Sequence, residues 1–414
     1  MRTRQHVLFL FSASLAAALT GGCALGPTAL ENNRWRYNDV IQRTTEEQLL
    51  LNLVRLQYRE SPLFLEVGSV SAQFRIAEDF GATGTIREGH HAVNPDQLAL
   101  NGAIAYEEKP TITFSPLQGR DFVSQLLAPL PLDAILLLAH SGWSVDRVAR
   151  LTINAMNGLD NASSASGPTP ELAPEYRDFA RVATLWRQLQ QEGLLHIGYE
   201  TREKTAAPAV PRERVGWSDL IAADQQGYTA RLSPDEQYLT LAGTSRTLLW
   251  RIPESARGRA DVKEILDLLG LDPALSEYAI TTSVGGQPEP GLKPGQRKTI
   301  NIATRSLMGT MFYLSQAVEV PDAHRQSGVV TSTLTADGAP FDWHEVTGGL
   351  LKIHARRLPP TGAAVAAYHR NCWFYIDDTD LTSKSTFSFL SQLFALQAGS
   401  VESVTPVLTL PIGG

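Results

Sequence analysis

The spacing of apolar residues predicts a helix that begins near residue 44. Leu49 and Leu53 recur at helical spacing, and Pro62 ends the pattern. Thr44 stands three residues before Glu47, which is the spacing of a capping box. We therefore expect the helix to start at Thr44.

Residues 63–114 change to a period of two, which is typical of strands. Strands are expected at residues 63–76, 98–106 and 111–114, with a polar loop at 78–96. Such a pattern predicts a β-hairpin or a small meander. One side of the first strand is polar, with Ser69, Ser71, Gln73 and Arg75. Glu66 and Gly68 interrupt the apolar side, which argues against strands that face lipid.

The rest of the chain mixes both periods without a regular strand–helix–strand alternation. Helical patterns cover residues 117–159, 174–191, 261–269, 305–318 and 383–398. Short strands are expected at 194–200, 227–232, 237–242, 246–252, 278–282, 329–335, 349–356, 363–369, 372–377 and 404–410. These patterns predict an α+β fold with mostly antiparallel short sheets in two or three subdomains.

Composition divides the chain at two stretches that read as linkers. Residues 160–170 are rich in Ser, Ala, Gly and Pro, and residues 283–297 are rich in Gly and Pro. The expected organisation is a signal peptide (1–22), a tether (23–43), and three folded parts (44–159, 171–282 and 299–414).

Charge and cysteine content narrow the class of protein. The 414 residues carry a formal net charge of −7, which disfavours a nucleic-acid partner because phosphate binding requires a basic surface. The chain has two cysteines, Cys23 and Cys372. If Cys23 is modified, no internal disulfide can form, and we interpret Cys372 as a buried small apolar residue.

The first residues have the pattern of an export signal. Arg2 and Arg4 precede a 14-residue uncharged run at 7–20, which is too short to span a bilayer as a helix. The sequence Leu19-Thr20-Gly21-Gly22-Cys23 resembles a bacterial lipobox, although Thr20 departs from the usual aliphatic residue. The alternative is ordinary cleavage, for example after Ala18 or Ala24.

The lipobox resemblance implies acyl chains on Cys23. Two or more chains hold a protein stably on a bilayer, whereas one binds marginally. Because Ala24 and not Asp follows Cys23, the resemblance implies the outer membrane, facing the periplasm. The acidic chain gains nothing from anionic headgroups, so the membrane should be a partner through the acyl chains alone.

Asp378 and Asp380 follow a strand-like segment in the order Asp-Thr-Asp-Leu-Thr. This resembles the first motif of haloacid-dehalogenase-like phosphatases, but only 32 residues follow Thr382, too few for the rest of that site. The same carboxylates could contribute to a Ca²⁺ site. The simpler interpretation is a turn whose side chains cap the next helix.

Aromatic residues near the C-terminus are weak binding candidates. Trp373 and Tyr375, with Trp343 and Phe341, could line a carbohydrate or peptide groove, although alternating aromatics in a strand are more often core residues. His344-Glu345 lacks the second histidine of a zinc-protease helix, and the glycines at 291 and 295 lack the spacing of a phosphate loop. We therefore expect no metal, no cofactor and no catalytic residue.

Residues 33–38, 47–56 and 373–396 resemble an uncharacterised group of Gram-negative envelope lipoproteins. This resemblance implies a location and no activity. The leading hypothesis is a lipid-anchored outer-membrane protein with a non-catalytic binding or scaffolding role toward an envelope protein or glycan. The alternatives are an envelope hydrolase with a dispersed site, and an assembly subunit that uses residues 63–114 for β-pairing.

Overall fold

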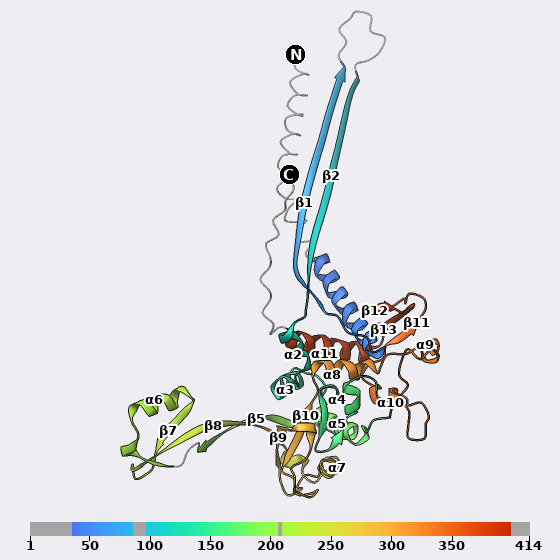
Figure 1. The fold of residues 1–414 in the computed structure, drawn as a ribbon. Helices are drawn as coiled ribbons and strands as arrows, with labels where there is room; N and C mark the ends of the chain where they lie inside the picture. The colour runs from blue at the N-terminus through green and yellow to red at the C-terminus, as the bar shows by residue number, and fades with distance from the viewer. Residues whose placement is uncertain (1–34, 86–96, 206–208, 399–414) are drawn as a thin grey trace, which may run out of the picture. The chain divides into compact units, whose positions relative to one another are not determined.

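The computed structural model describes residues 35–85, 97–205 and 209–398 (Figure 1). The chain forms two compact units. The first consists of Met1–Thr44, Leu63–Phe122 and Ser400–Gly414, and the second of Thr45–Pro62 and Val123–Gly399. Helices and mostly antiparallel sheets are mixed throughout, which confirms the predicted α+β class.

The first unit contains a long antiparallel hairpin made of β1 (Leu65–Thr85) and β2 (Gln97–Pro116). The predicted hairpin is confirmed, but the expected loop at 78–96 begins too early. Residues 78–85 continue β1 because each of them pairs with a residue of the segment 97–104. Near the base of the hairpin, the rings of Phe64 and Phe122 pack edge to face, with centroids 5.7 Å apart.

The first helix covers residues 35–57, so it starts before the predicted cap. Thr44 lies inside this helix, where its hydroxyl donates to the carbonyls of Val40 and Ile41 at 2.9 and 3.0 Å. Residues 35–43 are already helical, so the expected start at Thr44 is wrong. Leu50 and Leu53 are fully buried, as the helical spacing predicts.

The second unit is built around a mixed sheet whose path runs β4-β3-β10-β9-β8-β5. Its strands are β3 (Ile153–Met156), β4 (Leu159–Asp160), β5 (His196–Thr205), β8 (Tyr238–Arg251), β9 (Glu277–Thr282) and β10 (Thr299–Thr304). Only β9 and β10 pair in parallel. The sheet joins β3 to β10, so strands from before and after both expected linkers belong to one sheet.

Helices α4 (Val145–Thr152), α5 (Arg177–Gln191) and α7 (Ala260–Leu269) share one hydrophobic core with this sheet. Phe179 and Leu269 from the helices, and Trp250 and Tyr278 from the strands, are buried there. Helices α2 (Arg120–Leu127) and α3 (Leu132–His140) precede α4. In the described part of the chain, no helix is both long enough and apolar enough to cross a membrane.

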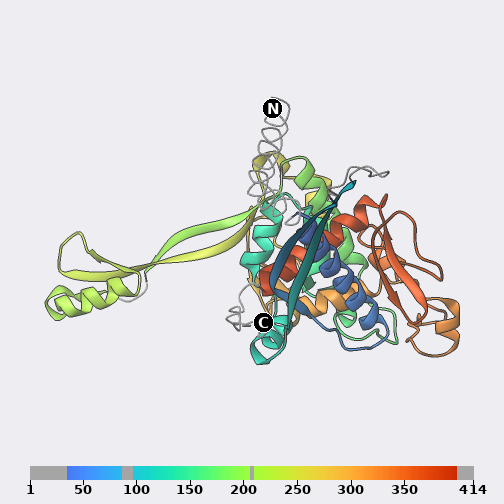
Figure 2. The ribbon, with the colours of Figure 1, turned by 90° about the horizontal axis from the view of Figure 1, so that it is seen from above.

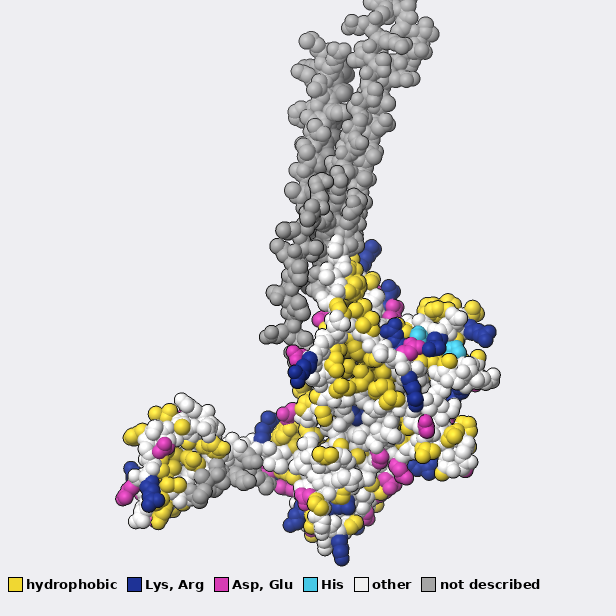
Figure 3. Space-filling view, viewed as in Figure 1, with side chains coloured by type: hydrophobic (Ala, Val, Ile, Leu, Met, Phe, Trp, Pro, Cys, Tyr) yellow, Lys and Arg dark blue, Asp and Glu magenta, His cyan; other side chains and the backbone are white. Residues whose placement is uncertain are grey.

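The outer part of β8 leaves the main sheet and carries its own small group of elements. There it pairs with β6 (Val210–Pro211) and β7 (Tyr228–Leu232), which flank α6 (Trp217–Gln225). In Figures 1 and 2 this group lies apart from the rest of its unit. Figure 3 shows hydrophobic side chains on it, and Trp217 and Ile221 of α6 are 83% and 57% exposed.

The C-terminal part of the second unit has a three-stranded antiparallel sheet in the order β11-β13-β12. The strands are β11 (His354–Arg356), β12 (Ala363–His369) and β13 (Cys372–Asp377), and the two longer ones match the predicted ranges. The helices are α8 (Leu307–Ser315), α9 (Asp322–Gln326), α10 (His344–Thr347) and α11 (Leu381–Ala398). No strand forms at 329–335, where only Leu334 makes isolated bridges, and the strand expected at 404–410 lies outside the described residues.

The first segment that reads as a linker is largely packed against the core, whereas the second is mostly exposed and packs closely at Gly286. Ala162 and Ala165 are fully buried in the first of them. In the second, Gly286 adopts a φ of +62°, and a Cβ there would lie 2.5 Å from the carbonyl oxygen of Ala155. Close packing therefore requires small residues at these positions. Composition alone cannot distinguish this requirement from a flexible linker.

Candidate functional site

The β1–β2 hairpin separates residue types between its two faces. Directly paired residues of an antiparallel ladder share a face, and successive residues alternate between faces. In the register of this ladder, every Leu, Ile, Val, Phe and Tyr of the two strands falls on one face. The other face holds polar residues, Ala and Gly, together with Arg75 and Lys109, the two basic residues of the strands.

A β-bulge makes this separation continuous. The register shifts between Val67 and Ser69, so that Gly68 is the extra residue. Val67 is opposite Phe114, and Val70 is opposite Ile112, two residues further along β2. The apolar positions on both sides of the bulge therefore lie on the same face, and Glu66 lies on the polar face.

The interruption expected at Glu66 and Gly68 is thus removed by the bulge. A period of two counted along β1 alone assigns Val67 and Val70 to opposite sides, because it cannot include an extra residue. Counted against β2, which has no bulge, the two valines share a side.

The apolar face is partly exposed where its side chains are described, although Val67 is half-buried. Within this unit Phe114 is 55% exposed, Leu65 38% and Ile112 37%. The edges are also open, because no third strand pairs with β1 or β2 among the described residues. A two-stranded hairpin is at best marginally stable by itself in water, and open edges are templates for another strand.

The second unit contains a cavity of about 490 Å³. Its walls include Gln57 at the end of the first helix, Gln316 directly after α8, and the aromatic residues Phe341 and Trp343. The rings of Phe341 and Trp343 meet edge to face, with centroids 5.2 Å apart. The indole nitrogen of Trp343 donates to the hydroxyl of Thr333 at 3.0 Å, which fixes the orientation of that ring.

The structure divides the predicted aromatic cluster into two places. Phe341 and Trp343 line this cavity, whereas Trp373 and Tyr375 are not among its lining residues. Trp373 packs with Tyr368 of the neighbouring strand, at a ring separation of 5.3 Å. Tyr375 stacks on His354 at the same separation, so both β13 residues make cross-strand pairs.

Asp378 and Asp380 lie in the turn between β13 and α11. Asp380 accepts hydrogen bonds from the backbone nitrogen and the hydroxyl of Ser383, and hydrogen bonding to the carboxylate lowers its pKa although burial acts in the opposite direction. Asp378 pairs with Lys384 at 2.6 Å. Both carboxylates therefore organise the start of α11, as the helix-capping interpretation predicts.

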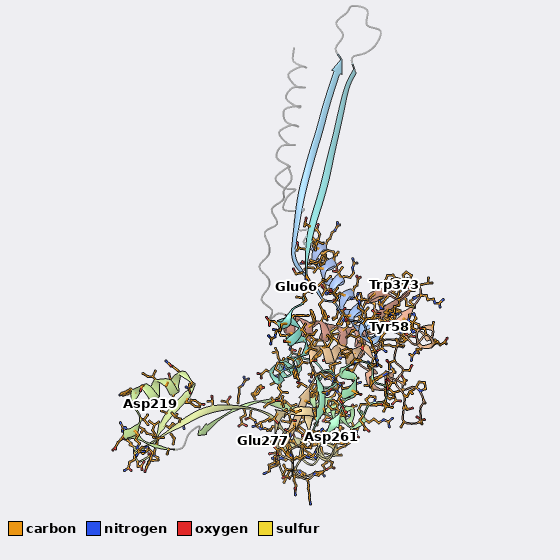
Figure 4. All side chains as sticks on the ribbon, in the orientation of Figure 1. Tyr58, Glu66, Asp219, Asp261, Glu277 and Trp373 are labelled. Atoms are coloured by element: carbon orange, nitrogen blue, oxygen red, sulfur yellow. The ribbon has the colours of Figure 1, made fainter. Side chains whose placement is uncertain are left out.

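Tyr58 is the centre of a cluster of titratable groups beside the C-terminal sheet. Its hydroxyl shares a 2.7 Å hydrogen bond with Nδ1 of His324, and its ring lies edge to face with His369 at 5.7 Å. Glu60 accepts from Arg370 at 2.7 Å and lies 3.1 Å from Nε2 of His369. Figure 4 labels Tyr58 and Trp373, which come from the end of the first helix and from β13.

Burial sets the protonation of this cluster. It raises the pKa of Tyr58 to about 12, with a smaller contribution from Cys372. It also lowers the pKa of His369, although Glu60 acts in the opposite direction. For Glu60 burial would raise the pKa, but the Arg370 hydrogen bond and His369 together lower it.

We expect the second unit to lose stability on acidification because of His369. Its pKa in the folded protein lies below the ordinary 6.5, so the unfolded chain binds more protons in this range. The stabilisation is complete above pH 6.5 and is lost as the pH falls through the lower folded value. Between pH 7.5 and 5, the midpoint of thermal unfolding should fall more steeply with pH for the wild type than for His369→Asn.

His196→Asn provides the control, because His196 is exposed and its ring bonds to a backbone carbonyl, that of Gly193. The unfolding midpoint of this variant should depend on pH as steeply as that of the wild type. Equal slopes for the wild type and His369→Asn would refute the assignment.

Comparison with protein-family models, curated protein sequences and solved structures returns no match. Cys23, the predicted lipidation position, lies outside the described residues. No sequence pattern selects Gln57 or Gln316, because neither belongs to a motif and they are 259 positions apart.

Proposed function

We propose that this chain is a subunit of a lipid-anchored envelope assembly, in which β1–β2 hairpins of several copies pair edge to edge. The observation that carries the proposal is the register of the hairpin. Its two strands of 21 and 20 residues pair only with each other in the described structure. Their register places the large apolar residues of both strands on one face. Further copies would supply the missing edge partners.

In this assembly the apolar face of the joined hairpins lies against lipid. Strands of 20 residues extend for about 66 Å at 3.3 Å per residue. A tilted strand needs about 9–11 residues to cross the hydrocarbon core, so each strand has ample length. The opposite face, with Arg75, Lys109 and many hydroxyl-bearing residues, would face water or the interior of the assembly.

Two carboxylates are the exceptions on the apolar face. Glu108 is opposite Phe74, and Glu78 is opposite Ile104, one on each side of the Ile76–Tyr106 pair. Acidic side chains on a lipid-facing strand are less costly than Lys or Arg, and both basic residues lie on the other face. Each of the two glutamates also has an apolar residue directly opposite.

The anchor and the hairpin would act together. Acyl chains on Cys23 would hold the chain at the periplasmic face of the outer membrane and raise the local concentration of hairpins there. The role remains non-catalytic in this proposal, with an envelope protein or glycan as a further partner of the second unit.

Shortening the hairpin should abolish the assembly. Phe74 and Glu108 are directly opposite, so residues 75–107 can be replaced by Asn-Gly, a dipeptide that closes a two-residue hairpin turn. Light scattering of the full chain, extracted from membranes in mild detergent, should give the mass of several copies for the wild type. The shortened variant should give the mass of one copy.

A Cys23→Ala variant separates the anchor from the assembly. It should carry no acyl chains at its amino terminus, yet still associate in detergent, because the hairpin is unchanged. A monomeric wild type, or an unchanged oligomer after shortening, would refute β-pairing. Mass spectrometry that shows an unmodified amino terminus in the wild type would instead refute lipidation at Cys23. Shortening the hairpin in the Cys23→Ala variant should release the chain from membranes, because neither attachment then remains.

A further inference from the structure

The arm at the outer end of β8 has almost no core of its own. We use this name for residues 210–243, which hold β6, α6, β7 and the outer part of β8. Only Ala223 and Leu239 are buried among them. So small a group needs a buried apolar core or a partner to be stable. The large apolar side chains of the arm are exposed instead: Val210, Trp217, Ile221, Leu232 and Tyr238.

Two of these residues form one exposed patch on α6. Trp217 and Ile221 are four positions apart, so their side chains lie on the same face of the helix. Clustered exposed apolar residues mark interaction sites, whereas single ones are normal. Tryptophan is among the residue types most enriched at the anchors of protein interfaces. The arm therefore presents a docking patch, and its partner must offer an apolar recess.

The chain itself has such a recess, a hollow of about 110 Å³ between α3 and the main sheet. The floor of the hollow is buried and includes Trp186, Leu248 and Ile302. An open hollow of this size accepts part of an aromatic ring, since a closed apolar cavity of about 150 Å³ holds a whole benzene. The mouth is open, because six apolar residues of the wall keep part of their surface exposed: Leu132, Ile135, Leu136, Ala139, Leu195 and Ile197.

The arm cannot fill the hollow of its own copy. β5 pairs with β8 without a break from His196 to Thr205. Helix α6 packs on β7, and β7 pairs with residues 239–243 of β8, which are five to nine positions from Leu248 in the floor of the hollow. At about 3.3 Å per residue, these positions lie roughly 16–30 Å from Leu248 along the strand. A paired ladder cannot fold back over that length, so Trp217 reaches such a hollow only on another copy.

We propose that the arm of one copy docks on the second unit of another copy, with the Trp217 ring in the hollow beside α3. Arm and hollow are different surfaces, so the contact is head-to-tail and can repeat from copy to copy. The proposal rests on the proposed function, because one aromatic anchor is too small an interface to hold separate copies together. Pairing of the hairpins would bring the copies close enough for the contact to form.

Cross-linking of the full chain in native membranes tests this contact. Ser218 follows Trp217 on α6 and His140 lines the mouth of the hollow, and both are exposed. A short bis-maleimide should join copies that carry both Ser218→Cys and His140→Cys into a ladder of dimers, trimers and longer chains on a denaturing gel. Each single-cysteine variant should remain one band, which also controls for reaction at Cys23 and Cys372.

Trp217→Ser in the double-cysteine chain should lower the cross-linked fraction roughly tenfold, because such anchors carry most of the energy of an interface. It should leave the unfolding midpoint unchanged, since Trp217 is largely exposed. Trp35→Ser is the matched control and should leave the ladder unchanged, because Trp35 is an exposed tryptophan outside the arm. Ser327→Cys in place of His140→Cys should abolish the ladder, because Ser327 is exposed but does not line the hollow.

Three results would overturn the docking contact. They are the absence of a ladder from the double-cysteine chain, a ladder that Trp217→Ser leaves unchanged, and dimers of Ser218→Cys alone, which would mean that two arms meet each other. Light scattering of the wild type measures hairpin pairing separately. An oligomer without cross-links refutes this contact alone, whereas cross-links between copies that are monomeric in detergent refute hairpin pairing alone.

Discussion

Replacing Arg305 with methionine should lower the free energy of unfolding of the second unit by about 3 kcal/mol, the range expected when a hydrogen-bonded buried cation is removed. Arg305 is 2% exposed. Burial lowers its pKa to about 10, so the guanidinium remains charged at neutral pH. It makes no ion pair with a carboxylate in the described structure, and its charge is balanced by backbone carbonyls and a ring.

The contacts of Arg305 explain why methionine cannot replace it. Its guanidinium donates to the carbonyls of Arg150 at 2.7 Å, Ile153 at 2.9 Å and Asn161, and to the hydroxyl of Ser166. It also lies 4.1 Å from the ring centroid of Tyr313. The carbonyls belong to the backbone, so no second substitution can remove the acceptors that methionine would leave.

Part of this loss should be buffered by Asn161. Its side-chain nitrogen donates to the carbonyls of Arg150 and Ile153, so these two acceptors keep one donor after the substitution. In the described part of the chain the carbonyl of Asn161 itself has no other donor. The double variant Arg305→Met with Asn161→Ala should therefore lose more stability than the two single losses combined.

Urea unfolding followed by tryptophan fluorescence measures this effect, since Trp186 and Trp250 are buried in the core of the same unit. Arg181→Met is the control. Arg181 forms a two-point ion pair with Glu264 at 2.6 and 2.8 Å, but its side chain is half exposed, so its loss should barely move the midpoint. Equal midpoints for both arginine variants would show that Arg305 is not an anchor of this fold.

The periodicity of the sequence predicted the elements that depend on local pattern. The strands at 363–369 and 372–377 and the helix before residue 191 follow from alternation and helical spacing, and the structure places them there. The start of the first helix could not be found in this way. Thr44 has the spacing of a cap, but nothing local shows that its hydroxyl is used by the carbonyls of Val40 and Ile41 instead.

The candidate surfaces depend on partners distant in the sequence, which is why they were largely missed. The apolar face of the hairpin is continuous only when Val67 and Val70 are assigned to faces by the β2 residues that they pair with. Gln57 and Gln316 belong to the wall of one cavity because the fold brings the end of the first helix and the end of α8 to it. The aromatic residue types predict a cluster of Trp343 with Phe341 and Trp373. The structure keeps Phe341 beside Trp343 and adds Thr333, but Trp373 packs with Tyr368 instead.

A lysine on the apolar face of the hairpin should weaken insertion into lipid far more than a lysine on the next residue. Ile76 is opposite Tyr106 on the apolar face, and Ala77 is opposite Ala105 on the polar face. A basic residue on a lipid-facing strand costs about 2–4 kcal/mol at the bilayer centre. At about 1.4 kcal/mol for each factor of ten, Ile76→Lys should reduce partition into vesicles by roughly 30-fold or more.

The full chain with Cys23→Ala is the right background, because acyl chains would otherwise hold every variant on the vesicles. Flotation with phosphatidylethanolamine–phosphatidylglycerol vesicles should recover the parent chain and Ala77→Lys equally in the lipid fraction, and Ile76→Lys in the soluble fraction. The vesicles are anionic, so non-specific attraction of the added charge would favour both lysine variants alike and cannot imitate the expected difference. If the two variants float equally, the face defined by the bulged register does not contact lipid, and the hairpins would have to cover their apolar sides against one another.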